Sequence, residues 1–218
     1  MFDDDIGKLI LPEEQIELLR ECWEKVVALG EERAGVVLFK NIFDSSSEVA
    51  QLFSFVEGPA ENGEFEFETL ARNPLLVKHA VGVIRTVSAV VHMLEEDEMI
   101  SPILKDLGAR HMLYEVKAEH YAIVGAAFLK TMRQALGEGY TGEVDEAFVG
   151  LWNSVIAELM QGCDSETVER AKCDIAEACG ETERGAFDSA FVARWSEEFV
   201  RVDSLQSQAS ETNSSGAD

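Results

Sequence analysis

The sequence has few basic residues for its length, and this shortage limits the partners it can have. Among its 218 residues, 18 are Lys or Arg and 42 are Asp or Glu, which gives a formal net charge of -24. A chain with this charge repels the phosphate backbone of nucleic acids and the surface of anionic membranes. We therefore expect no nucleic-acid partner.

Segments that direct a chain to or through a membrane are also missing. Residues 1–6 are acidic where a secretory signal is basic, and Phe2 excludes an N-myristoyl anchor. No apolar run reaches the ~18 residues of a membrane-spanning helix. The four cysteines include no C-x-x-C pair, which suits reduced thiols better than a disulfide framework or a zinc site. We expect a cytoplasmic protein without a membrane anchor.

Several motifs of common enzymes are absent as well. The patterns H-E-x-x-H, G-x-x-x-x-G-K and G-x-S-x-G do not occur. None of the four histidines follows a glutamate by three residues, which is the spacing that a carboxylate-bridged di-iron bundle needs. The sequence therefore disfavours a zinc protease, a P-loop nucleotidase, a serine hydrolase and a di-iron protein.

The sequence does contain a helical hydrophobic pattern. Apolar residues make up 46% of the chain and recur with a period of 3.6 nearly throughout, with no convincing alternating strand. This pattern predicts an all-α fold, with its longest helix from Pro74 to about Leu94 and a short helix that starts at Ser101-Pro102. We divide the chain into an acidic leader (1–10), a folded domain (11–162), a weakly helical extension (163–206) and a disordered tail (207–218).

A histidine lies on the apolar face of the short helix. His111 shares this face with Leu104, Leu107 and Gly108 at helical spacing. A glycine one turn below a histidine lets a flat, wide group approach the backbone closely. A single histidine on an apolar face is nevertheless more often a satisfied core residue, so this feature alone leaves both interpretations open.

A second histidine suggests a chemical role for the first. His79 lies at the edge of the apolar stripe of the long helix, 32 residues before His111. Two consecutive helices with one histidine each can form opposing walls of a crevice, and neutral imidazole is a good ligand of iron. Such a pair suits the two axial positions of a haem. The crevice would be lined by Phe39, Phe53, Val83, Leu107, Val116, Tyr121 and Phe128.

Three segments resemble the globin family, and within it the neuroglobin-like branch. Residues 107–121 (LGARHMLYEVKAEHY) are similar to the segment that carries the proximal, iron-binding histidine. Residues 74–83 (PLLVKHAVGV) are similar to the distal helix. Residues 49–55 (VAQLFSF) are similar to the segment whose first phenylalanine stacks on the porphyrin. The resemblance covers about residues 11–162.

The resemblance implies a fold and a function. A globin fold, which is a three-over-three helical sandwich, would hold haem b with His111 as the proximal ligand of the iron. His79 would lie on the distal side, and Phe53 would stack on the porphyrin. The protein would bind dioxygen or other diatomic gases reversibly. The neuroglobin-like pattern also favours bis-histidine coordination, in which His79 ligates the iron when no gas is bound.

Two other functions stay open. Haem chemistry also permits nitric-oxide dioxygenation or nitrite reduction. The sequence has no flavin or nicotinamide module, so such an enzyme would need a separate electron-transfer reductase. The third possibility is an acidic helical interaction protein without a cofactor.

The chain departs from the family pattern at several positions. Ser47 stands where a proline usually follows the second helix, and as a capping residue it can do a related job. Gly82 stands where a basic residue often contacts a haem propionate. We expect Arg110 or Lys78 to supply that contact if it is made.

Overall fold

The computed structural model describes residues 11–59, 63–95 and 97–163. These residues form helices, with no strand among them, in agreement with the predicted all-α fold. In chain order the elements are α1 (Glu13–Ala28), α2 (Glu31–Ser45), α3 (Ser47–Gln51), α4 (Phe67–Ala71), α5 (Pro74–His92), α6 (Asp97–Leu113), α7 (Ala118–Leu136), the 3-10 helix η1 (Gly137–Gly139) and α8 (Gly142–Gln161). The predicted leader, and the predicted extension and tail beyond residue 163, lie outside the described residues.

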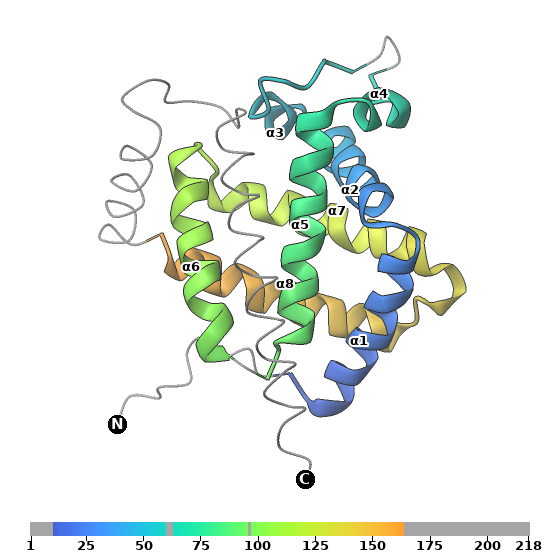
Figure 1. The fold of residues 1–218 in the computed structure, drawn as a ribbon, viewed down its shortest axis with the longest axis vertical. Coiled ribbons are helices and arrows are strands. Elements are labelled where there is room, and N and C mark those ends of the chain that lie inside the picture. Colours follow the sequence, from blue (N-terminus) through green and yellow to red (C-terminus); the bar gives the residue numbers. More distant parts are fainter. Residues whose placement is uncertain (1–10, 60–62, 96, 164–218) are drawn as a thin grey trace.

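The helices form two layers that cross each other. In Figure 1, α5 and α6 lie in front, and α7 and α8 run across behind them. Helix α6 packs against α8, whereas α5 packs against α2, which also contacts α7. The two helices that carry His79 and His111, α5 and α6, are therefore each anchored to a different neighbour.

Polar side chains cap the helices near the expected positions. The side chain of Asn73 accepts hydrogen bonds from the backbone N–H groups of Leu75 and Leu76, and Pro74 follows it as the first residue of α5. This is the predicted start of the long helix. For α3 the capping residue is Ser46, whose hydroxyl accepts from the backbone N–H of Val49. The expectation that Ser47 does this job was wrong by one residue.

Helix α6 begins earlier than predicted. It spans Asp97–Leu113 and contains Pro102, whereas the sequence suggested that Ser101-Pro102 starts it. Proline lacks one backbone donor, and near the N-terminus of a helix this loss removes a single hydrogen bond. The hydroxyl of Ser101 is also occupied, because it donates to the buried carboxylate of Glu158 on α8 at 2.5 Å. Ser101 therefore ties α6 to α8 instead of capping α6.

Two glycines let α6 and α8 approach each other closely. A Cβ atom at Gly108 would lie 1.9 Å from the carbonyl oxygen of Leu159, and one at Gly162 would lie 1.8 Å from that of Lys105. The space above Gly108 is thus filled by the backbone of α8. This corrects the expectation of a notch for a flat ligand. Helical periodicity shows which residues share a face, but it does not show which neighbour that face meets.

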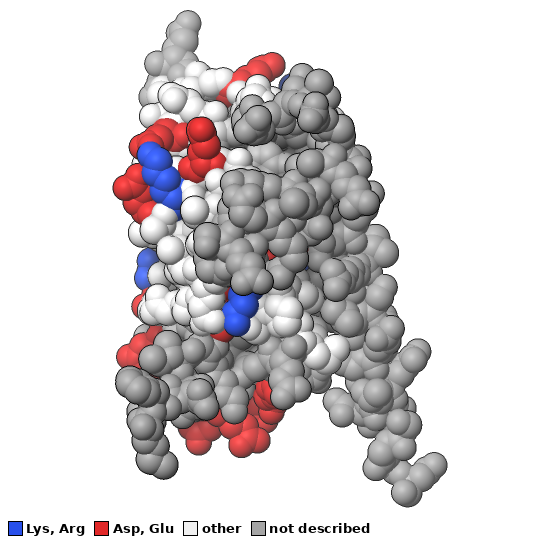
Figure 2. Space-filling model, turned by 90° about the vertical axis from the view of Figure 1, so that its left-hand side faces the viewer, with Lys and Arg blue, Asp and Glu red and all other residues white. Residues whose placement is uncertain are grey.

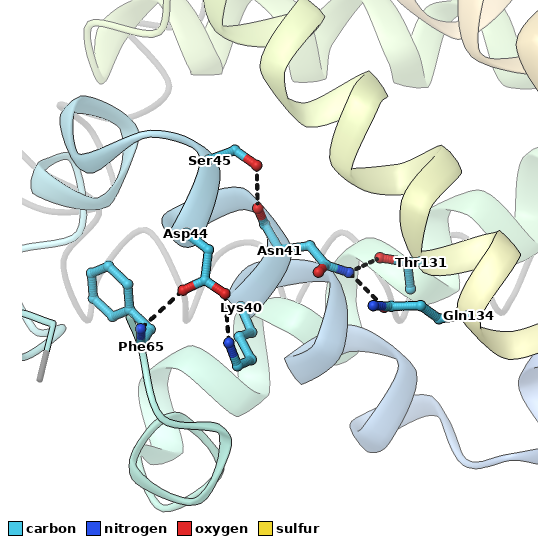
Figure 3. A network of polar contacts seen from close by, with 7 residues as sticks. All are labelled: Lys40, Asn41, Asp44, Ser45, Phe65, Thr131 and Gln134. Atoms are coloured by element: carbon cyan, nitrogen blue, oxygen red, sulfur yellow. Dashed lines mark hydrogen bonds and ion pairs between the residues drawn. The ribbon is translucent and has the colours of Figure 1, made fainter. Parts of the chain in front are cut away.

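Hydrogen bonds from the buried amide of Asn41 and to the carboxylate of Asp44 hold α2 in place (Figure 3). The side-chain amide of Asn41 donates to Thr131 Oγ1 and to Gln134 Oε1 on α7, both at 2.9 Å. Asp44 accepts a hydrogen bond from the backbone N–H of Phe65 at 2.9 Å. These contacts join α2 to α7 and to the segment before α4, and so fix the helix that supplies Phe39 to the site.

Two properties of the surface and core bear on the expected environment of the protein. On the face shown in Figure 2, the charged side chains of the described residues are mostly acidic. One helix, Pro74–His92, is long and apolar enough to cross a membrane by length and composition, with a mean hydropathy of 1.4. The expectation that no segment is long and apolar enough to span a membrane therefore needs correction. Half of that helix is buried against the rest of the chain, as in the core helix of a soluble protein.

Candidate functional site

A cavity lies between α5 and α6, with further walls from α2, α3, α7 and α8. Its empty space measures about 840 Å³, including solvent at its mouth. Both His79 and His111 line it, so the structure brings the two predicted ligands to one cavity.

His79 reaches the cavity from α5 and is 3% exposed. Its ring lies against Phe39 and Phe53, with ring centroids 5.2 and 5.5 Å away. Burial, and then the nearby His111, lower the pKa of His79 to about 3. The imidazole of His79 is therefore neutral at physiological pH, which is the state that can ligate a metal.

His111 reaches the same cavity from α6, one turn after Leu107. Its Nδ1 lies 2.8 Å from the carbonyl oxygen of Leu107. A carbonyl oxygen only accepts hydrogen bonds, so Nδ1 carries the proton and Nε2 keeps its lone pair. Burial lowers the pKa of His111, and the bond to Leu107 opposes this only in part. Metal-ligating histidines usually have this arrangement, with the second ring nitrogen bonded to a backbone carbonyl or carboxylate.

Most of the predicted site residues line the cavity. They are Phe39, His79, Val83, Leu107, His111, Val116 and Tyr121. Phe53 and Phe128 are not part of the lining. Phe53 lies behind His79 and also packs edge-on against Phe39. Phe128 stacks on Trp152, which does line the cavity, with ring centroids 5.3 Å apart.

The sequence interpretation missed more than half of the lining. The residues not predicted are Leu38, Ile42, Val49, Leu52, Thr86, Val87, Leu104, His120, Val124, Trp152, Val155 and Leu159. Thr86 and Leu104 could have been found, because each lies seven residues from a histidine on the same helix face. Helix α8 carries no histidine among its described residues, so nothing in its sequence indicated which side faces the cavity.

A group of charged residues at the edge of the cavity is an ion-pair cluster and not a metal site. Nε2 of His120 and the carboxylates of Glu48 and Glu119 lie within 4.8 Å of one another. Nζ of Lys117 already lies 3.5 Å from a carboxylate oxygen of each glutamate. The backbone N–H of Lys117 donates to Nδ1 of His120, so the neutral ring carries its proton on Nε2 and has no lone pair there. The cluster joins α3 to the start of α7.

The donor groups of the cavity fit a haem better than a hydrated metal ion. The imidazoles of His79 and His111 face a mostly apolar space, whose third histidine, His120, belongs to the ion-pair cluster at its edge. No carboxylate, lysine or arginine is among the lining residues in the described part of the chain. Hard cations prefer several oxygen ligands, whereas haem iron accepts imidazole within an apolar pocket. Arg110 and Lys78, which were expected to contact a haem propionate, do not line the cavity. Arg110 pairs with Asp106 at 2.7 Å.

Comparison with known proteins places the chain in a family. A family model described as Globin matches residues 36–159, and the chain therefore belongs to the globin family. Globins bind haem and, at its iron, diatomic gases. The neuroglobin of Dissostichus mawsoni is 27% identical over 154 residues, which cover 70% of this chain and 92% of that protein. The predicted membership of the family, with a neuroglobin-like sequence, is confirmed.

A solved structure and a further relative extend the comparison. The crystal structure of the neuroglobin from the acoel Symsagittifera roscoffensis matches with a TM-score of 0.59 and 18% identity, over 69% of this chain and 98% of that chain. It confirms the all-α globin fold. A protein named anaerobic nitrite reductase HBI from Casuarina glauca is 25% identical over 154 residues, covering 69% of this chain and 96% of that protein.

Proposed function

We propose that this chain is a cytoplasmic haem b globin that binds dioxygen or other diatomic gases reversibly. In this proposal His111 would hold the haem iron at all times, and His79 would be a second ligand of the iron when no gas is bound. The observation that carries the proposal is the pair of imidazoles from α5 and α6 that line one cavity. Haem, when bound, would supply an iron that takes up imidazole and diatomic gases.

The protein residues have distinct tasks in this proposal. The carbonyl of Leu107 holds the ring of His111 in the tautomer that presents Nε2 to the cavity. The ring of His79 is positioned by the rings of Phe39 and Phe53, which contact it. The apolar walls keep water away from both nitrogens. Buried Cys22, which forms no disulfide, is consistent with a reducing cytoplasm.

If His79 ligates the iron, a gas can bind there only after His79 has moved away. The fraction of protein in which His79 is away from the iron sets the apparent affinity, because only that fraction can take up gas. Movement of His79 must also displace it from Phe39 and Phe53, since both rings contact it. The packing of Phe39 and Phe53 against His79 therefore helps to determine how readily gas binds.

Absorbance spectra of the reduced, gas-free holoprotein test this proposal. We expect a sharp pair of visible bands, which indicates six-coordinate low-spin iron. His79→Leu should change this to a single broad band, because leucine cannot ligate iron. His92→Leu is the matched control on the same helix, since His92 is exposed and bonds to Ser88. An unchanged spectrum in His79→Leu would exclude the internal ligand, and a protein without a Soret band after haem is supplied would contradict haem binding itself.

Nitrite reduction is the second candidate function, and the similarity to a protein named as a nitrite reductase favours it. Converting nitrite to nitric oxide and water takes one electron and two protons, so turnover requires an external electron donor. Nitrite consumption should be measured with the reduced protein alone and with an added reductase. Many equivalents consumed per haem would support an enzyme, whereas a single equivalent in both conditions would leave gas binding as the function.

A further inference from the structure

A second hollow lies on the outside of the molecule between α7 and α8. It encloses about 790 Å³ of empty space, including open solvent. Its lining combines small residues of α7 with larger apolar residues of both helices, among them Leu129, Val149 and Ile156. Tyr121 and Trp152 line both this groove and the cavity between the two histidines. We call this hollow the α7–α8 groove.

The groove is shaped by a row of small residues. Ala118, Ala122 and Ala126 follow one another at intervals of four residues along α7, and all three are exposed. Beside them, a Cβ atom at Gly125 would lie 2.2 Å from Nε1 of Trp152, so the indole lies directly on the backbone of α7. The row therefore forms a shallow furrow beside a fixed aromatic wall, which can accept large side chains from another helix.

The sequence beyond the described residues contains a matching row of large side chains. The stretch 187–205 carries Phe187, Phe191, Trp195 and Phe199, again at intervals of four residues. Helices pack by placing the ridge of one into the groove of the other, and rows with a spacing of four are the commonest pair. We propose that residues 187–205 of the same chain dock as a helix in the α7–α8 groove. This inference does not depend on the proposed ligation of iron by His79.

The connection between the two parts is long enough for this docking. The centre of the groove near Asn153 lies ten residues before residue 163, or about 15 Å along α8. The stretch 164–186 has 23 residues, and a chain of this length can span up to about 75 Å when fully extended. A tethered segment of this kind has an effective concentration in the millimolar range. Docking within one chain is therefore favoured over docking between copies at ordinary protein concentrations.

Docking would connect the extension to the cofactor cavity. Trp152 separates the groove from the cavity and stacks on Phe128. A side chain placed in the groove presses on the outer side of this wall. The extension is thus positioned to restrain a wall of the gas-binding cavity without contacting any ligand.

Photo-crosslinking in the full-length holoprotein tests the proposal. Phe191 is replaced by p-benzoylphenylalanine, and the products of irradiation are mapped by mass spectrometry. We expect links within one chain to residues 118–129 and 149–156. Ala122→Trp fills the groove and should reduce these links at least about tenfold, because the site can no longer accept a large ring. Ala28→Trp, at an exposed alanine on α1, should leave them unchanged.

Other results would overturn the proposal. Links to other parts of the body, the absence of links, or links found only between two copies would each exclude docking within the chain. Equal yields in Ala122→Trp and the parent protein would do the same. A second measurement avoids any folding defect of Ala122→Trp: the double substitution Phe191→Ala and Trp195→Ala should speed amide hydrogen exchange in residues 118–129 by at least about threefold. Unchanged exchange rates there would contradict the proposal.

Discussion

Replacing Gly108 with alanine should change the position of His111, although Gly108 itself does not line the cavity. The new Cβ would lie 1.9 Å from the carbonyl oxygen of Leu159, whereas ordinary contacts begin at 3.4 Å. The backbones must therefore separate by 3.4 minus 1.9, or about 1.5 Å, along this line. Overpacking of this kind lowers the free energy of unfolding by up to about 3 kcal/mol. The better helix propensity of alanine offsets about 1 kcal/mol of this loss. We expect a net loss of about 2 kcal/mol in the free energy of unfolding.

The displacement should also reach His111, the proposed ligand of the iron. Leu107 and His111 belong to the same two turns of α6, and the bond between them sets the direction of the imidazole. Gly108→Ala should therefore lose haem faster to a haem-acceptor protein, in addition to having a lower urea midpoint. The control is Gly142→Ala at the first residue of α8, where an added Cβ meets nothing within 4 Å. If Gly108→Ala matches the parent protein in both assays, the close helix contact does not position His111.

Two further substitutions test polar contacts away from the cavity. Ser101→Ala removes the donor to buried Glu158 and should lower the free energy of unfolding by about 1–3 kcal/mol, as measured by urea denaturation; Ser101→Thr, which keeps the hydroxyl, should lose less. The hydroxyl of Tyr140, and then Arg133, lower the pKa of Asp145. A depressed pKa in the folded state stabilises the protein above the unfolded pKa of about 3.9, and this contribution is lost as the pH falls through the folded pKa. Asp145→Asn should therefore be less stable than the parent at pH 7, with a gap that closes in acid; a gap that stays constant with pH would contradict this assignment.

The two histidines show what helical periodicity can predict. His79 and His111 each lie on an apolar stripe, and the order of their helices is enough to suggest a shared cavity. Phe53 and Phe128 show the limit of this reasoning. An apolar stripe spans 100° or more of a helix, so residues on it can face either the ligand or a neighbouring helix. Only the packing of Phe53 behind His79 and of Phe128 behind Trp152 decides between these positions.

The start of α6 illustrates a second limit. A capping residue followed by proline is a common helix start. Asn73-Pro74 follows this pattern and does begin α5. At Ser101 the hydroxyl instead meets Glu158, a residue 57 positions later in the chain. Local signals cannot reveal such a partner, because it is brought near only when α6 and α8 pack together.

The hydrogen bond from His111 to the main chain affects how this protein can change during evolution. Its acceptor is the carbonyl of Leu107, which every amino acid provides at that position as long as the helix persists. A mutation of Leu107 can reshape the wall of the cavity while the tautomer and basicity of the imidazole stay as they are. The shape of the cavity and the basicity of the His111 imidazole can therefore vary independently. The cavity wall at Leu107 can change during evolution while the hydrogen bond that orients His111 is kept.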